Sequence, residues 1–382
     1  MKLFQKLITA PAALGFLIPS AAFAEEIKLA DISNYSSSKE VKSISDFNPA
    51  EELAVTNSRI DGLEAKFNDI EAGSFSETTT MSGTAAFLIG ATDSATPAND
   101  KVMMEYFYEV DLNTSFTGED KLNIEIETGN ATGVGVGADK VGLDWGSDNG
   151  DTLKISDVNY TFPIGEWKVA FGESMDASKT WPNACSMNNM VDNLGDCGAG
   201  NSVDLGGDIS LSTSRGFGDG WEIGLGTSAN DGETTKGIFT EESADYYGIA
   251  LGYETDNYGF TVAYSDKDTA TYTGLTAFYS PESTPVTLSG GFELTNPEAS
   301  GDKDKSQWAL GVSTEVGEGT LSLNAGTNGA IAYDAEEIYA YDLSYEYPIN
   351  DGMSITPFVY IAETVSGTDD TTGAGAFVSF SF

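Results

Sequence analysis

Hydrophobic and polar side chains alternate with a period of two along most of the chain. In the second alternating segment, Val102, Met104 and Tyr106 share one face, whereas Glu105 and Glu109 share the other. This pattern predicts β-strands with one apolar face and one hydrated face. We predict sixteen strands, at 80–91, 102–116, 122–128, 152–162, 167–173, 204–214, 221–228, 244–255, 258–265, 271–280, 285–295, 306–316, 319–327, 336–347, 353–362 and 373–382.

The predicted strands are joined alternately by short turns, such as 117–120 and 317–318, and by mostly longer polar segments, such as 174–203. Aromatic residues gather where strands meet the short turns, as expected of rings at a membrane–water interface. In one strand Ile155 falls out of phase with Val158, which a β-bulge would explain. The alternating connection lengths predict an all-β fold, a 16-stranded antiparallel transmembrane β-barrel.

A soluble β-propeller or solenoid is the alternative, because its strands would also alternate. The acidic face argues against it. Carboxylates cannot be buried dry without a large desolvation cost, so this face needs water while the opposite face needs an apolar medium. A membrane barrel with a hydrated lumen meets both requirements for Glu105, Glu109, Asp111, Glu125 and Glu127.

The N-terminal part of the chain has a different pattern. Residues 1–24 combine lysines, an apolar run and a small-residue end, which predicts a secretory signal peptide rather than an anchor helix. A polar linker is predicted at 25–50. Apolar residues at three- and four-residue spacings across 51–72 predict a short coiled-coil helix, or else a single amphipathic helix. The barrel domain is predicted at 73–382.

The composition excludes several functions. The chain has 18 Lys and Arg against 60 Asp and Glu, a formal net charge of −42, and it contains no histidine. Nucleic-acid binding needs a basic face, which this chain cannot build. The absence of histidine removes the common hydrolytic triads and most zinc sites. We therefore predict no enzymatic activity, no metal site and no cofactor.

The long segment 174–203 contains Cys185 and Cys197, which predict either a local disulfide in an oxidising compartment or two free thiols. As the third long connection, this segment is the candidate for a constriction loop folded into the lumen. A plain surface loop is the alternative. In the first case, the residues expected to border the constriction are Asp176, Trp181, Asp192 and Asp196.

The inward-facing charges suggest ion selectivity. A lumen lined by carboxylates should attract cations, although these residues could also be merely a hydrated wall. The predicted function is a passive channel for small hydrophilic solutes in which inorganic cations, including iron, are favoured. A surface or adhesive barrel with a plugged lumen is the alternative. The candidate pore-lining residues are Glu105, Glu109, Asp111, Glu125, Glu127 and Lys168.

Several segments resemble the cyanobacterial porins of the OprB-like, carbohydrate-selective family: the start Met1–Leu7, Ser43–Phe47, Ser58–Lys66, and Gly73–Ser76 before the first strand. The resemblance implies a homotrimeric 16-stranded channel in outer-membrane lipid that passes carbohydrates. Members usually carry a surface-layer homology domain that grips the cell wall. The 25–50 segment is too short for that domain, so a peptidoglycan tether is in doubt here.

Overall fold

The computed structural model describes residues 78–93, 101–130, 149–364 and 370–382. They belong to one unit of the chain, Thr78–Phe382. The predicted signal peptide, linker and coiled-coil helix lie outside the described residues. Within the described ranges, none of the helices has the length and apolar character needed to cross a membrane.

The described residues form sixteen long β-strands, a two-residue strand, β14 (Ile331–Ala332), and two short helical turns, η3 (Asp192–Gly198) and α5 (Gly200–Val203). The long strands are β1 (Thr79–Asp93), β2 (Met103–Thr114), β3 (Lys121–Gly129), β4 (Lys154–Ile164), β5 (Trp167–Glu173), β6 (Ile209–Phe217), β7 (Trp221–Asn230), β8 (Ala244–Glu254), β9 (Tyr258–Asp266), β10 (Ala270–Tyr279), β11 (Val286–Pro297), β12 (Lys305–Val316), β13 (Gly319–Thr327), β15 (Tyr339–Asn350), β16 (Met353–Ala362) and β17 (Thr371–Ser381).

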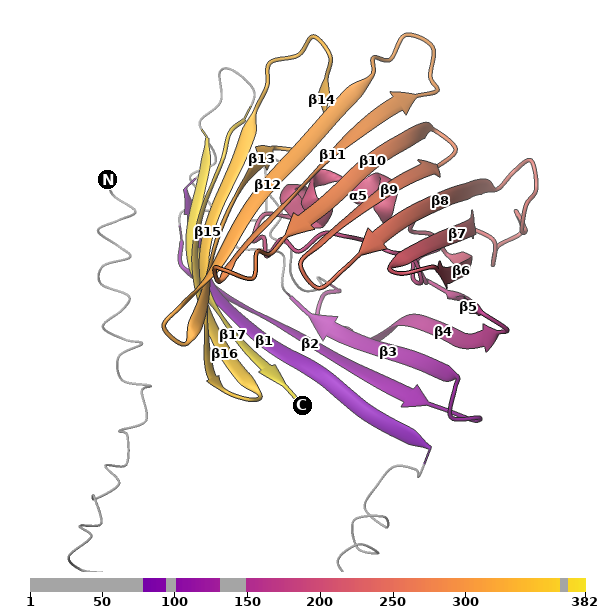
Figure 1. Ribbon diagram of the computed structural model, residues 1–382, viewed down its shortest axis with the longest axis horizontal. Helices are drawn as coiled ribbons and strands as arrows, with labels where there is room; N and C mark the ends of the chain where they lie inside the picture. The colour runs from indigo at the N-terminus through magenta and orange to yellow at the C-terminus, as the bar shows by residue number, and fades with distance from the viewer. Residues whose placement is uncertain (1–77, 94–100, 131–148, 365–369) are drawn as a thin grey trace, which may run out of the picture. The chain divides into compact units, whose positions relative to one another are not determined.

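The sixteen long strands close into a barrel (Figure 1). Each pairs antiparallel with its neighbours along the chain, and β1 pairs with both β2 and β17, which leaves no open edge. Thr84 of β1, for example, lies opposite Glu109 on one side and Ser381 on the other. The prediction of a 16-stranded antiparallel barrel is confirmed.

The two faces of the barrel wall differ as the alternation predicts. On β6, Leu211 is exposed on the outer face, while Ser210 and Ser212 are buried on the inner face. On β13, exposed Leu323 alternates with buried Ser322 and Asn324 in the same way. An outer face of exposed aliphatic side chains suits lipid, and an inner face of small polar side chains suits water or another polar segment.

The short connections lie at one end of the barrel, where the turns after β4 and β12 have two residues each. Gly165 and Gly317 occupy the first position of these two turns. Their φ angles of 62° and 67° are ones that glycine adopts without steric cost. Aromatic rings pack near this end, as in the cluster of Phe217, Trp221 and Tyr253.

The largest difference between a predicted and an observed strand boundary is at the start of β6. A strand was expected at 204–214, but β6 begins at Ile209. The preceding residues belong to the returning end of a long connection, where Leu205 O accepts a hydrogen bond from Ala177 N–H at 2.6 Å. At Gly207 the backbone passes so close to β7 that a Cβ would lie 1.8 Å from Ser228 Oγ.

A β-bulge interrupts the pairing of β3 with β4. Glu125 lies opposite Asp157, but the next residue, Ile126, lies opposite Ile155, so Ser156 is the extra residue. The bulge restores the alternation, because it lets exposed Ile155 share the outer face with Val158 while Asp157 faces the lumen.

Candidate functional site in the barrel lumen

Carboxylates lie side by side on the inner face of β2 and β3. In the antiparallel register Glu109 lies opposite Glu127, and Asp111 lies opposite Glu125. All four are partly exposed, on the face opposite to Tyr108 and Leu112. Directly opposed residues of this kind have Cβ atoms about 5 Å apart, so the four negative charges form one patch. We call Glu109, Asp111, Glu125 and Glu127 the acidic wall.

The register extends the acidic wall across β4 in three rows. The first row runs Glu109–Glu127–Lys154, the second Asp111–Glu125–Asp157, and the third Asn113–Asn123–Asn159. Side-chain hydrogen bonds connect the second row with the third. Asn123 Nδ2 donates to Asp111 Oδ1 at 2.7 Å and to Asn113 Oδ1 at 3.1 Å, and Asn159 Nδ2 donates to Asn123 Oδ1 at 3.1 Å.

The other two predicted pore-lining residues lie apart from the acidic wall. Glu105 is on the inner face of β2 but is only 7% exposed, opposite Leu88 of β1. Lys168 is exposed on the inner face of β5, where it pairs with Pro163 near the short-turn end. Four of the six predicted pore-lining residues therefore lie together in the acidic wall, and two do not.

Residues 174–208, which connect β5 to β6, run inside the barrel and are called the inner loop here; α5 is visible within the ring of strands (Figure 1). Glycines on the inner wall make room for it, because a Cβ at these positions would collide with inner-loop atoms. The closest such approaches are at Gly224 and Gly248 to Trp181, Gly226 to Ala177, Gly252 to Pro182, Gly274 to Ser202, Gly291 to Cys197, Gly311 to Met187 and Gly326 to Leu194.

Wall side chains also accept hydrogen bonds from the inner-loop backbone, which satisfies donors that would otherwise be buried. The acceptors come from β6, β9, β11 and β15. They are Ser212 Oγ for Thr180 N–H (3.1 Å), Thr261 Oγ1 for Ala184 N–H (3.1 Å), Ser289 Oγ for Ser186 N–H (2.9 Å), Glu293 Oε2 for Ser202 N–H (2.7 Å) and Asp342 Oδ2 for Met190 and Val191 N–H (2.9 and 3.2 Å).

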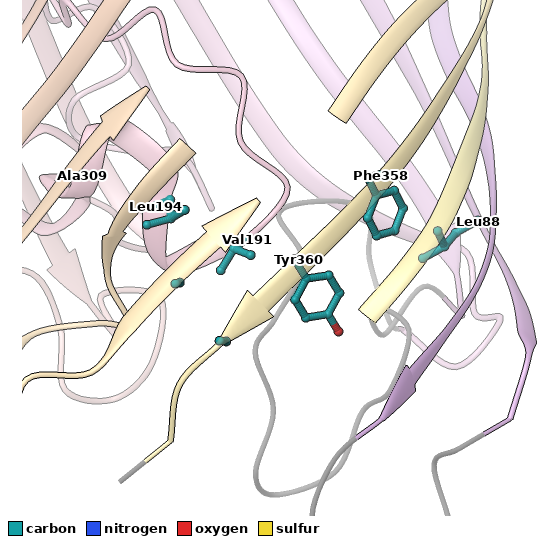
Figure 2. Packing of buried hydrophobic residues seen from close by; sticks show 8 residues of the cluster. Leu88, Val191, Leu194, Ala309, Phe358 and Tyr360 are labelled. Carbon is teal, nitrogen blue, oxygen red and sulfur yellow. The ribbon is translucent and has the colours of Figure 1, made fainter. Parts of the chain in front are cut away.

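The far end of the inner loop is held by apolar packing (Figure 2). Val191 and Leu194, both fully buried, join a cluster that includes Ala309 of β12 and Tyr360 of β16. A disulfide between Cys185 and Cys197 closes the intervening stretch. These hydrogen bonds and this packing hold the inner loop to strands from β6 to β16, whereas the acidic wall lies on β2 and β3.

The residues expected at the constriction have different environments. Trp181 lies over the glycines of β7 and β8 and is half-buried. Asp192 is exposed, and Asp196 accepts a hydrogen bond from Asn183 Nδ2 at 2.8 Å. Both aspartates line a polar cavity of about 600 Å³ together with Asn201, Asp204, Lys267 and Gln307, among other residues.

Asp176 lies near the start of the inner loop and faces lumen water. Reduced hydration, followed by repulsion from the Asp204 carboxylate, raises the pKa of Asp176 to about 6. The unfolded chain would ionise this acid near its ordinary value of 3.8. The folded state therefore loses stability relative to the unfolded state as the pH rises from about 4 to about 6, and this loss persists at higher pH.

We therefore expect Asp176→Asn to melt at a higher temperature than the wild type at pH 7.5, with the difference vanishing near pH 4. Thermal unfolding of the detergent-solubilised barrel at both pH values measures this. The control is Asp351→Asn, which removes the same charge from an exposed turn. An equal difference at both pH values would contradict the assignment to Asp176.

Sequence reasoning did not identify Asp157, Glu293 or Asp342 as lumen residues. Asp157 follows the bulge, and its inward direction could have been found from the phase break at Ile155. Glu293 and Asp342 alternate inward on their strands, but nothing in the sequence pairs them with the inner loop. Among the residues that the structure describes, no group of three or more His, Cys, Asp or Glu is placed to hold a metal ion.

Comparisons with known proteins agree with this architecture. Residues 55–368 match the model of the Gram-negative porin family. The barrel is similar to the anion-selective porin from Comamonas acidovorans (TM-score 0.59, 14% identity, 80% of this chain and 99% of that one). It is also similar to a high-pH structure of OprB from Pseudomonas putida (TM-score 0.60, 10% identity, 80% of this chain and 94% of that one).

A curated relative, the uncharacterized protein alr4550 of Nostoc sp., is 33% identical over an alignment of 135 residues, and the match covers 32% of this chain. The chain spans about a quarter of the length of that relative, 24%. The structural similarities show the fold, and the family model covers most of the sequence. The chain therefore belongs to the Gram-negative porin family and is an outer-membrane protein.

Proposed function

We propose that this porin is a passive diffusion channel that favours cations, and that the acidic wall provides the preference. The observation that supports the proposal is the register of β2 and β3, which sets Glu109 against Glu127 and Asp111 against Glu125 on the hydrated face. Carboxylates so close together repel one another, and mobile cations relieve that repulsion. Anions gain no such interaction there.

The inner loop would form the constriction in this proposal. It is fixed to one side of the lumen, so solutes would pass between it and the acidic wall. Of its charged residues one is basic, Lys179, and five are acidic: Asp176, Asp192, Asp196, Asp204 and Asp208. Both sides of the passage would then favour cations. Small hydrophilic solutes, with inorganic cations first and carbohydrates as a further class, are the proposed cargo.

On the basis of the resemblance to OprB-like porins, the proposed oligomeric state is a homotrimer. Light scattering in detergent tests this part directly, because a trimer has three times the molar mass of the chain. A monomeric barrel that conducts would remove the trimer from the proposal and leave the channel.

We expect the double variant Glu109→Gln with Asp111→Asn to lower the potassium-to-chloride permeability ratio about fivefold, since each lost charge in water changes a nearby ion's energy by roughly RT. The ratio is measured as the reversal potential of single channels across a potassium chloride gradient. The matched control is Glu119→Gln with Glu282→Gln, which removes two charges from exposed turns.

An unchanged permeability ratio in the lumen variant would show that the acidic wall is not the selectivity filter. A correctly folded barrel that never opens would favour a plugged barrel with a surface or adhesive role instead.

A further inference from the structure

Two lysines lie at the β4 edge of the acidic wall, Lys154 on β4 itself and Lys179 on the inner loop. The first row of the acidic wall, Glu109–Glu127, continues to Lys154. The second row, Asp111–Glu125, continues to Asp157, which is 8% exposed. Lys154 thus ends the first row directly. Lys179 reaches the end of the second row through an ion pair with Asp157.

That ion pair joins the inner loop to the wall. Lys179 Nζ lies 2.7 Å from Asp157 Oδ2, and Asn159 Nδ2 donates to both Asp157 oxygens at 3.0 Å. The Lys179 side chain is 31% exposed and the Asp157 side chain 11%, so lumen water screens the pair only partly. The ammonium group thus lies beside Asp157, which is next in register to Glu125 at the edge of the acidic wall.

We propose that Lys179 is a residue that determines ion selectivity: its ammonium neutralises Asp157 and thereby confines the carboxylate patch on this part of the barrel wall to β2 and β3. This deepens the proposed function and rests on it. The inner loop would then have two effects on permeation, because it narrows the lumen and also sets how many carboxylates remain uncompensated.

The two partners of the ion pair make opposite predictions. Lys179→Met leaves Asp157 uncompensated, so we expect the potassium-to-chloride permeability ratio to rise about two- to threefold. Asp157→Asn keeps the shape of the side chain and removes the ion-pair partner of Lys179, so the ratio should fall by a similar factor. The double variant should return close to the wild-type ratio, and Lys179→Arg should leave it unchanged.

Loosening of the inner loop would give a different result, since either single variant would break the same contact and shift the ratio and the conductance in the same direction. A shift in the same direction for both, or no shift in either, overturns the proposal. Each variant is first checked for a folded, heat-modifiable barrel. If Lys179→Met does not fold, Lys179→Gln takes its place beside Asp157→Asn.

Failure of this proposal can be told apart from failure of the proposed function. A wild-type channel without cation preference would refute the proposed function, whatever the variants do. A cation-preferring wild type whose ratio does not respond to Lys179→Met and Asp157→Asn would refute the role of Lys179 alone.

Discussion

Gly226→Ala is expected to destabilise the barrel by about 1–3 kcal/mol, the usual cost of adding a methyl group to a filled site. A Cβ at this position would lie 2.1 Å from Ala177 O and 3.0 Å from Trp181 Cζ2. Ala177 O is a backbone atom of a fully buried residue. The N–H group of Ala177 donates a hydrogen bond to Leu205 O. The inner loop cannot yield there without losing that hydrogen bond.

Thermal unfolding of the purified barrel measures the loss, and hydrogen exchange at residues 177–181 shows whether it arises at the inner loop. The matched control is Gly216→Ala, also on the inner wall, where the nearest atom to a Cβ would be Trp221 O at 3.7 Å. Equal melting temperatures for Gly226→Ala and the wild type would mean that the inner loop is not seated on β7 as described.

Asp342→Ala is expected to release the far end of the inner loop, at a cost of about 3 kcal/mol for a buried acceptor of several hydrogen bonds. The Asp342 carboxylate is 2% exposed and accepts from the backbone N–H groups of Met190 and Val191. It also accepts from Asn324 Nδ2 at 2.7 Å. Alanine would leave these donors without their acceptor.

Hydrogen exchange at residues 188–194 should therefore become faster, while exchange in the barrel strands changes little. Asp342→Asn keeps one acceptor oxygen and should show a smaller effect. Glu346→Ala provides the matched control, because it removes a carboxylate from the inner face of the same strand at a position that pairs with Thr320. Slow exchange at 188–194 in Asp342→Ala would show that apolar packing alone holds this end.

The fold could be predicted from the sequence because a membrane barrel imposes the same rule on every strand. Each strand must show lipid an apolar face and the lumen a polar one, so the period of two repeats along the chain. The predicted strands 319–327 and 353–362 match β13 and β16 to the residue. The prediction was wrong at 204–214, where residues such as Leu205 alternate but pair with the other end of the inner loop.

The site was less predictable, because its contacts join residues that are far apart in the sequence. Alternation alone brought Glu109, Asp111, Glu125 and Glu127 to one face, since they lie on a single hairpin. The contact of Met190 with Asp342 spans 152 residues, and no local pattern encodes it. The glycines of β7 and β8 can be read from the sequence. Only the structure shows why these positions are glycine, because the indole of Trp181 lies against them.

The position of the disulfide constrains the order of events during assembly. Cys197 is fully buried, and its Sγ lies 3.1 Å from Ser289 Oγ on the inner wall of β11. An oxidising enzyme could not reach this sulfur once the strands had closed around it. We therefore expect enzyme-catalysed formation of the Cys185–Cys197 bond to take place in the periplasm while the chain is still open, before insertion into the outer membrane.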